Sequence, residues 1–193
     1  MIEYIKGTIT RITPTYLTVE TGGIGYNVNI SLTTFSKLDG KSDFKVLVHE
    51  VIKEDSHQLF GFADSEERDI FRLLISVSGV GANTARMMLS SLNPAEIEKA
   101  IIGSEVDILK SVKGIGLKTA QRIIIDLKDK LGKQSASGEI FAYTDNTRRE
   151  EALSALVMLG FAKSAVTKIL DKIVRENRNQ TVEDMIKGAL KNL

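Results

Sequence analysis

The chain has 193 residues, of which 42% are apolar, and its 26 Lys and Arg against 25 Asp and Glu give a formal net charge of +1. This composition predicts a packed core and by itself neither favours nor excludes a nucleic-acid partner. The absence of cysteine excludes disulfides, thiolate zinc sites, iron–sulfur clusters and a cysteine nucleophile. The sequence contains no apolar run of 18 residues and no signal-peptide pattern after Met1, so we expect a cytoplasmic protein without a membrane segment.

Residues 1–63 show the period-2 alternation of β-strands. Tyr26, Val28 and Ile30 alternate with two asparagines, and a similar pattern covers 46–51, which places alternate side chains on opposite faces of a strand. Turn-forming residues separate the runs at 13–15, 22–23 and 39–40. About five short strands in this space predict a small closed barrel, which leaves no exposed strand edge.

Residues 64–133 change to helical periodicity, with short helices separated by glycines. Asp64 followed by Glu67, and Asn93-Pro94 followed by Glu96, are typical of helix starts. Residues 108–133 carry seven Lys and Arg against two acids. On charge alone, this segment is either a solvated helix face or a nucleic-acid surface.

An internal repeat lies within this helical part. Residues 76–88 and 111–123 are identical at six of thirteen positions, at a constant offset of 35, with two glycines and a Thr-Ala pair in register. Two copies are too few for a solenoid. The repeat is therefore interpreted as a pair of equivalent motifs.

Each copy is predicted to be a helix end, a Gly-x-Gly turn and a second helix. Glycines can adopt positive φ and allow another backbone to approach closely, and the first amides of the second helix have no intrahelical acceptor. Such amides, with the helix dipole, bind an anion such as phosphate, and a phosphate carries no sequence information.

Three other interpretations of the repeat stay open. Gly114-x-Gly116 resembles part of a dinucleotide fingerprint, although it follows a helix and not a strand. Gly116-Leu117-Lys118-Thr119 resembles the end of a nucleotide-binding P-loop, although Leu117 interrupts the Gly-Lys-Thr order. Finally, the glycines could serve only to let two helical hairpins pack closely.

Residues 134–146 lack either periodicity and are rich in small and polar types, which predicts a flexible linker. Helical patterning resumes at Thr147 and Glu150, another pair typical of a helix start, and Thr181 is expected to cap a later helix. Residues 147–193 are therefore predicted to form a small domain of three helices. Such a domain is at the limit of what can fold alone.

The repeat resembles the helix-hairpin-helix motif, a binder of the DNA phosphate backbone. Together with the preceding barrel and the C-terminal helices, the whole chain resembles the RuvA family, whose members bind Holliday junctions. The matching stretches are 1–7, 22–26, 54–62 and both copies of the repeat. The resemblance implies an OB-fold barrel in 1–63, a DNA-binding domain of two helix-hairpin-helix motifs in 64–133, and a C-terminal domain that binds a motor.

The resemblance also implies site residues. The expected DNA contacts, to which we add Arg122 from the basic segment, are Gly79, Gly81, Asn83, Thr84, Gly114, Gly116, Lys118, Thr119 and Arg122. Asn83 and Leu117 stand where relatives often carry lysine, so the backbone amides are expected to contribute more at these positions. Glu54 and Asp55 match an acidic pin near the junction centre; without the family, two acids in a hairpin turn are ordinary loop residues. Leu159, Gly160 and Phe161 are the candidate motor contact, and Phe161 could equally well close the core of its own domain.

We therefore expect a DNA-binding subunit that is not an enzyme, with no metal and no cofactor. The expected partners are four-way junction DNA, a RuvB-type hexameric ATPase and a RuvC-type resolvase. The resemblance implies a homotetramer, and one or two tetramers (an octamer) could hold the junction. The alternative is a structure-specific nuclease or DNA glycosylase that uses the hairpins for grip, and a pure protein-interaction scaffold comes third.

Overall fold

The computed structural model describes residues 1–135, 143–176 and 180–192, and the chain divides into two compact units, Met1–Gly132 and Lys133–Leu193. Each unit is described by itself. In the part of the chain that is described, no helix combines the length and the apolar character needed to cross a membrane.

The first unit begins with the predicted barrel. Its strands are β1 (Tyr4–Ile12), β2 (Tyr16–Thr21), β3 (Ile24–Ile30), β4 (Asp43–Ile52) and β5 (His57–Phe62). They close in the order β1-β2-β3-β5-β4, and all neighbours are antiparallel except β3 and β5. The barrel prediction is confirmed.

The two faces of strand β4 pack against different hydrophobic cores. Val46 and Val48 are fully buried inside the barrel, as the pattern predicts, while Leu47 and Val51 pack against the core of the helices that follow. The strand is therefore covered on both sides. One face of the barrel is in this way part of the helical core.

A helix that the sequence did not predict, α1 (Leu32–Leu38), lies between β3 and β4. Ser31 is its N-cap and accepts a hydrogen bond from the Thr34 amide at 3.0 Å. The segment contains adjacent threonines and leads into Asp39-Gly40, a combination that favours strands and turns. The turn at 39–40 therefore follows a helix and does not connect two strands.

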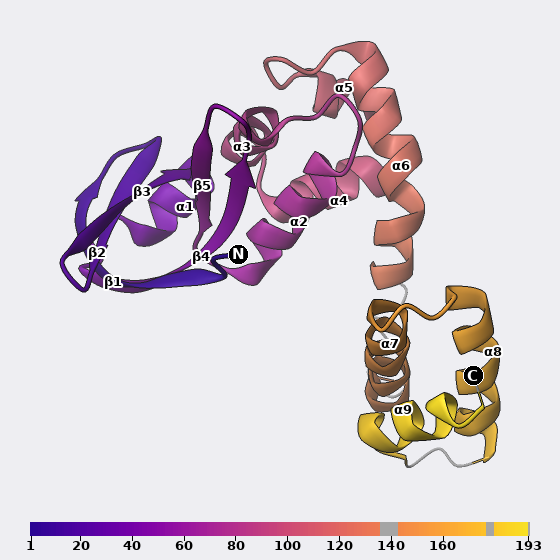
Figure 1. Cartoon of the computed structure of the whole chain (residues 1–193). Helices are drawn as coiled ribbons and strands as arrows, with labels where there is room; N and C mark the ends of the chain where they lie inside the picture. Colours follow the sequence, from indigo (N-terminus) through magenta and orange to yellow (C-terminus); the bar gives the residue numbers. More distant parts are fainter. Residues whose placement is uncertain (136–142, 177–179, 193) are drawn as a thin grey trace. The chain divides into compact units, whose positions relative to one another are not determined.

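The helical part of the first unit contains α2 (Ser65–Ile75), α3 (Ala82–Ser91), α4 (Pro94–Ile102), α5 (Val106–Lys110) and α6 (Leu117–Ser135). Asn93 and Glu96 form the predicted capping box at the start of α4. As Figure 1 shows, α2 runs alongside β4 and β5. Phe71 of α2 packs against Phe60 and Phe62 of β5, with ring centroids 5.3 and 4.9 Å apart. The outer face of β4 and β5 thus belongs to the core of the helices, which is separate from the core inside the barrel.

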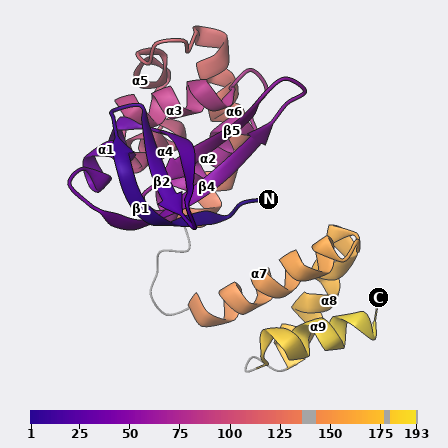
Figure 2. The ribbon, with the colours of Figure 1, turned by 60° about the vertical axis from the view of Figure 1, so that its left-hand side comes forward.

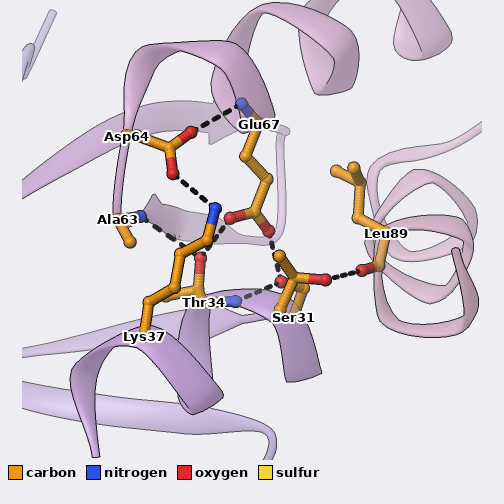
Figure 3. Close-up of polar contacts among 8 residues, drawn as sticks. Ser31, Thr34, Lys37, Ala63, Asp64, Glu67 and Leu89 are labelled. Atoms are coloured by element: carbon orange, nitrogen blue, oxygen red, sulfur yellow. Dashed lines mark hydrogen bonds and ion pairs between the residues drawn. The ribbon is translucent and has the colours of Figure 1, made fainter. Parts of the chain in front are cut away.

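A buried polar cluster joins the barrel to α2 (Figure 3). Asp64 is the N-cap of α2, as predicted, and accepts from the Glu67 amide at 3.0 Å. The Glu67 side chain does not complete a capping box. It is fully buried, and it accepts hydrogen bonds from the hydroxyls of Ser31 and of Thr34, the latter at 2.7 Å. Beside it, Lys37 of α1 and Asp64 form an ion pair at 2.6 Å.

The second unit contains α7 (Tyr143–Met158), α8 (Lys163–Glu176) and α9 (Val182–Leu190), which share an apolar core. Thr181 caps α9 as predicted, accepting from the Asp184 amide at 3.2 Å. The predicted bounds of the linker are wrong at both ends, because 134–135 belong to α6 and α7 begins at Tyr143, four residues before the expected start. The remaining linker residues, 136–142, lie outside the described residues.

Candidate nucleic-acid interface

The first copy of the repeat forms a hairpin of α2 and α3. Val77 and Val80 are buried on either side of the turn, and the Val80 amide donates to the Val77 carbonyl at 3.0 Å. Between them Gly79 has a φ of +94°, which L side chains rarely adopt. The turn therefore depends on this glycine.

The second copy reproduces this geometry between α5 and α6. Val112 and Ile115 are buried, the Ile115 amide donates to the Val112 carbonyl at 3.0 Å, and Gly114 has a φ of +94°. The sequence repeat is thus a structural repeat.

The second glycine of each motif has a different role from the first. Gly81 is the N-cap of α3 with φ −86° and ψ 166°, which is extended backbone. The Gly-x-Gly pattern allows a positive φ at both glycines of a motif, but Gly116 does not have one either. A Cβ built on Gly81 or Gly116 would meet no atom within 4 Å. The lack of a side chain at Gly81 and Gly116 leaves open space in front of the helix, and their backbone conformation does not itself require glycine.

The first backbone amides of α3 and α6 lie next to this open space, and they have no hydrogen-bond acceptor within their helix. The first helical bonds run from Ala85 to Gly81 and from Ala120 to Gly116, each 2.9 Å long. The three amides before each donor therefore have no intrahelical acceptor, and a glycine N-cap has no side chain to supply one. Both helix starts can accept an anion.

The predicted contact residues Asn83, Thr84, Lys118 and Thr119 lie in the first turns of α3 and α6. Asn83 and Lys118 are exposed, and both threonines are half-buried. Leu117, at the position where a lysine is common, is 52% exposed. In the first turn of α6, the local positive charge therefore comes from Lys118 and not from the residue before it.

An open pocket of about 590 Å³ lies between the first turn and α6. Its lining residues are Ser78 and Gly79 from the first turn and Lys118, Thr119, Gln121, Arg122, Ile125 and Asp126 from α6. Nη1 of Arg122 lies 3.3 Å from Ser78 Oγ and 3.5 Å from the Ser78 carbonyl oxygen. Ser78 was not among the predicted site residues. The only sign of it in the sequence is its alignment with Lys113 in the repeat.

The candidate acidic pin lies in the turn between β4 and β5. The Lys53 amide donates to the Ser56 carbonyl at 2.8 Å and closes a turn in which Glu54 and Asp55 are exposed. Figure 2 shows this hairpin extending beyond the rest of the barrel. Among the residues that the structure describes, neither carboxylate has a cation within ion-pair distance, so both present uncompensated charge.

The predicted motor contact, Leu159, Gly160 and Phe161, lies at the C-terminal end of α7. Gly160 has a φ of +98°, its amide donates to Val157, and the Phe161 amide donates to Leu156 at 3.2 Å, which is the Schellman arrangement. Phe161 packs against the core of the second unit. The exposed apolar side chains at this end of α7 are Met158 (85%) and Leu159 (63%).

Neither histidine belongs to a catalytic arrangement within the described residues. His57 contacts Glu50 at 2.8 Å on the barrel surface. The His49 ring packs edge-on against Phe71, and burial lowers the pKa of its imidazole. Over the same residues, no three His, Cys, Asp or Glu side chains gather as a metal site.

Comparison with known proteins covers all three parts of the chain. Family models match residues 1–61 (RuvA N terminal domain), 71–129 (SAM-like helix-hairpin-helix tandem) and 147–193 (RuvA, C-terminal domain). Relatives named Holliday junction branch migration complex subunit RuvA occur in Christiangramia forsetii (53% identity), Flavobacterium psychrophilum (49%) and Bacteroides fragilis (48%). Each alignment covers 100% of this chain and 100% of the relative.

Proposed function

The chain belongs to the RuvA family, and on this basis we propose that it binds four-way junction DNA as the recognition subunit of a branch migration complex. The observation that carries the proposal is the pair of equivalent hairpins. Each has a glycine N-cap in front of three unpartnered helix amides, with open space for a phosphate.

Binding is independent of base sequence on this account. Backbone amides and the dipoles of α3 and α6 contact phosphate oxygens, which are the same for every base. Lys118 adds a cation at the second hairpin. The contacts therefore position DNA without reading it.

The exposed carboxylates of Glu54 and Asp55 act as an acidic pin. Two uncompensated charges on a projecting turn repel phosphates that come near them. A continuous duplex would bring its backbone against the turn, whereas an open crossover has space there. The pin thus supplies selectivity for the junction and lowers affinity for other DNA.

The partners and the assembly are part of the same proposal. Four chains form a homotetramer, with a second tetramer giving an octamer, and the assembly holds the junction for a separate RuvB-type hexameric ATPase. The second unit contacts this ATPase through the exposed Met158 and Leu159, and a RuvC-type resolvase can act on the same junction. A cytoplasmic location follows, since bacterial DNA lies there.

The chain does not cut DNA on this account. Among the described residues, no three His, Cys, Asp or Glu side chains gather as a metal site that could support a metal-dependent nuclease. A gel-shift assay with magnesium on two immobile junctions of unrelated arm sequence tests the proposal. We expect equal retention and intact strands, whereas cleaved strands would favour the enzyme alternative and sequence-dependent retention would contradict phosphate binding.

A further inference from the structure

The two hairpins differ sharply in charge although their backbones are equivalent. Residues 76–85 of the first hairpin contain no Lys or Arg, whereas the matching residues 111–120 contain Lys113 and Lys118. Both hairpins offer the same unpartnered amides. The first hairpin therefore lacks a cation of its own, which a phosphate site normally includes.

A cation reaches the first hairpin from the second. Arg122 is on α6, yet its guanidinium lies 3.3 Å from Ser78 Oγ, next to Gly79 in the first turn. The repeat offset of 35 places Met87 at the matching position on α3. The arrangement is thus asymmetric, with a cation on α6 facing the first turn and no equivalent cation on α3.

The other arginine near the first hairpin is engaged elsewhere. Nη1 of Arg86 in α3 donates to the Thr15 carbonyl of the β1–β2 turn at 2.8 Å, and burial lowers its pKa. It holds α3 to the barrel. Arg122, by contrast, is exposed and meets only neutral oxygen atoms of Ser78.

We propose that Arg122 supplies the cation of the first hairpin's phosphate site, although it belongs to the helix of the second hairpin. Its guanidinium has five donors, so it can keep its contact with Ser78 and also bind a phosphate held by the amides behind Gly81. It replaces the lysine that position 83 lacks. This inference rests on the proposed function and assigns one residue to one of its two phosphate sites.

Energetic coupling between variants tests the assignment on the full-length protein. Arg122→Ala is measured for junction binding in three backgrounds: the parent, Gly81→Ala and Gly116→Ala. The two glycine variants are a matched pair, because each adds one methyl group in the space for a phosphate and meets no protein atom within 4 Å. Loss of a charge-assisted hydrogen bond should weaken binding about tenfold in the parent.

We expect the same loss in the Gly116→Ala background and little further loss in the Gly81→Ala background, since two changes at one site are not additive. Lys118→Ala is the control and should show the reverse coupling. If Arg122→Ala couples to Gly116→Ala, or is additive with both glycine variants, the assignment is wrong. Asn83→Asp repeats the test at the first hairpin should Gly81→Ala fail to fold, because an acid in a first helical turn is favourable to the helix.

A purely structural role of Arg122 gives a different result. If the arginine only ties α6 to the first turn, Ser78→Ala should weaken binding as much as Arg122→Ala, and the salt dependence of binding should be unchanged. As a phosphate contact, Arg122→Ala lowers the salt slope by about one unit and Ser78→Ala changes binding little. If no hairpin variant alters junction binding at all, the proposed function itself fails.

Discussion

Gly79 and Gly114, at equivalent positions of the internal repeat, have the same φ of +94°. In both turns the next glycine, Gly81 or Gly116, avoids positive φ and faces open space. Each pair thus contains one glycine that the turn requires and one that faces open space, where we expect a phosphate.

The first prediction uses this difference. Gly114→Ala should lower the free energy of unfolding by about 1–2 kcal/mol, because alanine is strained at positive φ. Gly116→Ala should unfold like the parent but bind DNA about tenfold more weakly, since its methyl group obstructs the phosphate contact. Denaturant unfolding and junction titration of both variants measure this. Equal stability of the two variants would contradict the assignment of roles.

Lys118 is expected to act through charge alone. Lys118→Ala should weaken binding by a similar factor on every base sequence and lower the slope of log affinity against log salt by about one unit. Lys110→Ala is a suitable control, since Lys110 already pairs with Asp107 at 2.9 Å. An unchanged slope, or a loss that varies with sequence, would show that Lys118 does not contact phosphate.

The acidic pin is expected to change selectivity. Replacing Glu54 by Gln and Asp55 by Asn keeps side-chain size while removing both charges. Duplex binding should tighten by about tenfold in total, and the junction-to-duplex affinity ratio should fall. In the parent, high salt should reduce this ratio as the carboxylates are screened. Should both affinities change by the same factor across a salt series, the two acids are plain loop residues.

The Glu67 cluster predicts a pH effect on stability. Burial raises the pKa of Glu67 above its ordinary value, although the hydroxyls of Ser31 and Thr34 oppose this, and Lys37 and Asp64 add smaller, opposite effects. A carboxyl whose folded pKa is raised binds its proton more tightly in the folded protein. Its contribution to stability is therefore fully present below the unfolded pKa and is lost as pH rises through the folded pKa.

The Glu67→Gln variant isolates this effect. The unfolding free energy of the parent minus that of the variant should increase as pH falls from neutral towards the ordinary pKa of a glutamate, about 4.3, and should be constant below it. Urea titrations of both proteins across this range measure the difference. A difference that shrinks on acidification would mean that Glu67 is ionised in its buried site and stabilised by its donors.

The barrel and the hairpins could be predicted because they depend on local patterns. Period-2 alternation indicates the strand faces that carry Val28 and Val46, and the repeated glycines indicate both turns. Helix α1 could not be predicted, because its stability comes from Ser31, Thr34 and the distant Glu67, which the fold brings together.

In the candidate site, too, the residues with a local sequence pattern could be predicted and the contacts made by the fold could not. The glycines and Lys118 follow from the motif, but the approach of Arg122 to Ser78 joins residues 44 positions apart. The predicted motor contact is Leu159, Gly160 and Phe161, and a Gly followed by an apolar residue is also typical of a helix end. Gly160 and Phe161 do end α7, and contact with a motor stays a prediction at these positions.

Competition between a four-way junction and linear duplex measures the preference of the protein for branched DNA. Labelled junction is bound to the full-length protein, and unlabelled junction or duplex of equal length and base composition is added at a fixed salt concentration. We expect unlabelled junction to displace the labelled junction at a far lower concentration than duplex does. Equal displacement by the two competitors would contradict this expectation, because the paired hairpins would then bind any DNA backbone and the chain would have no preference for branched DNA.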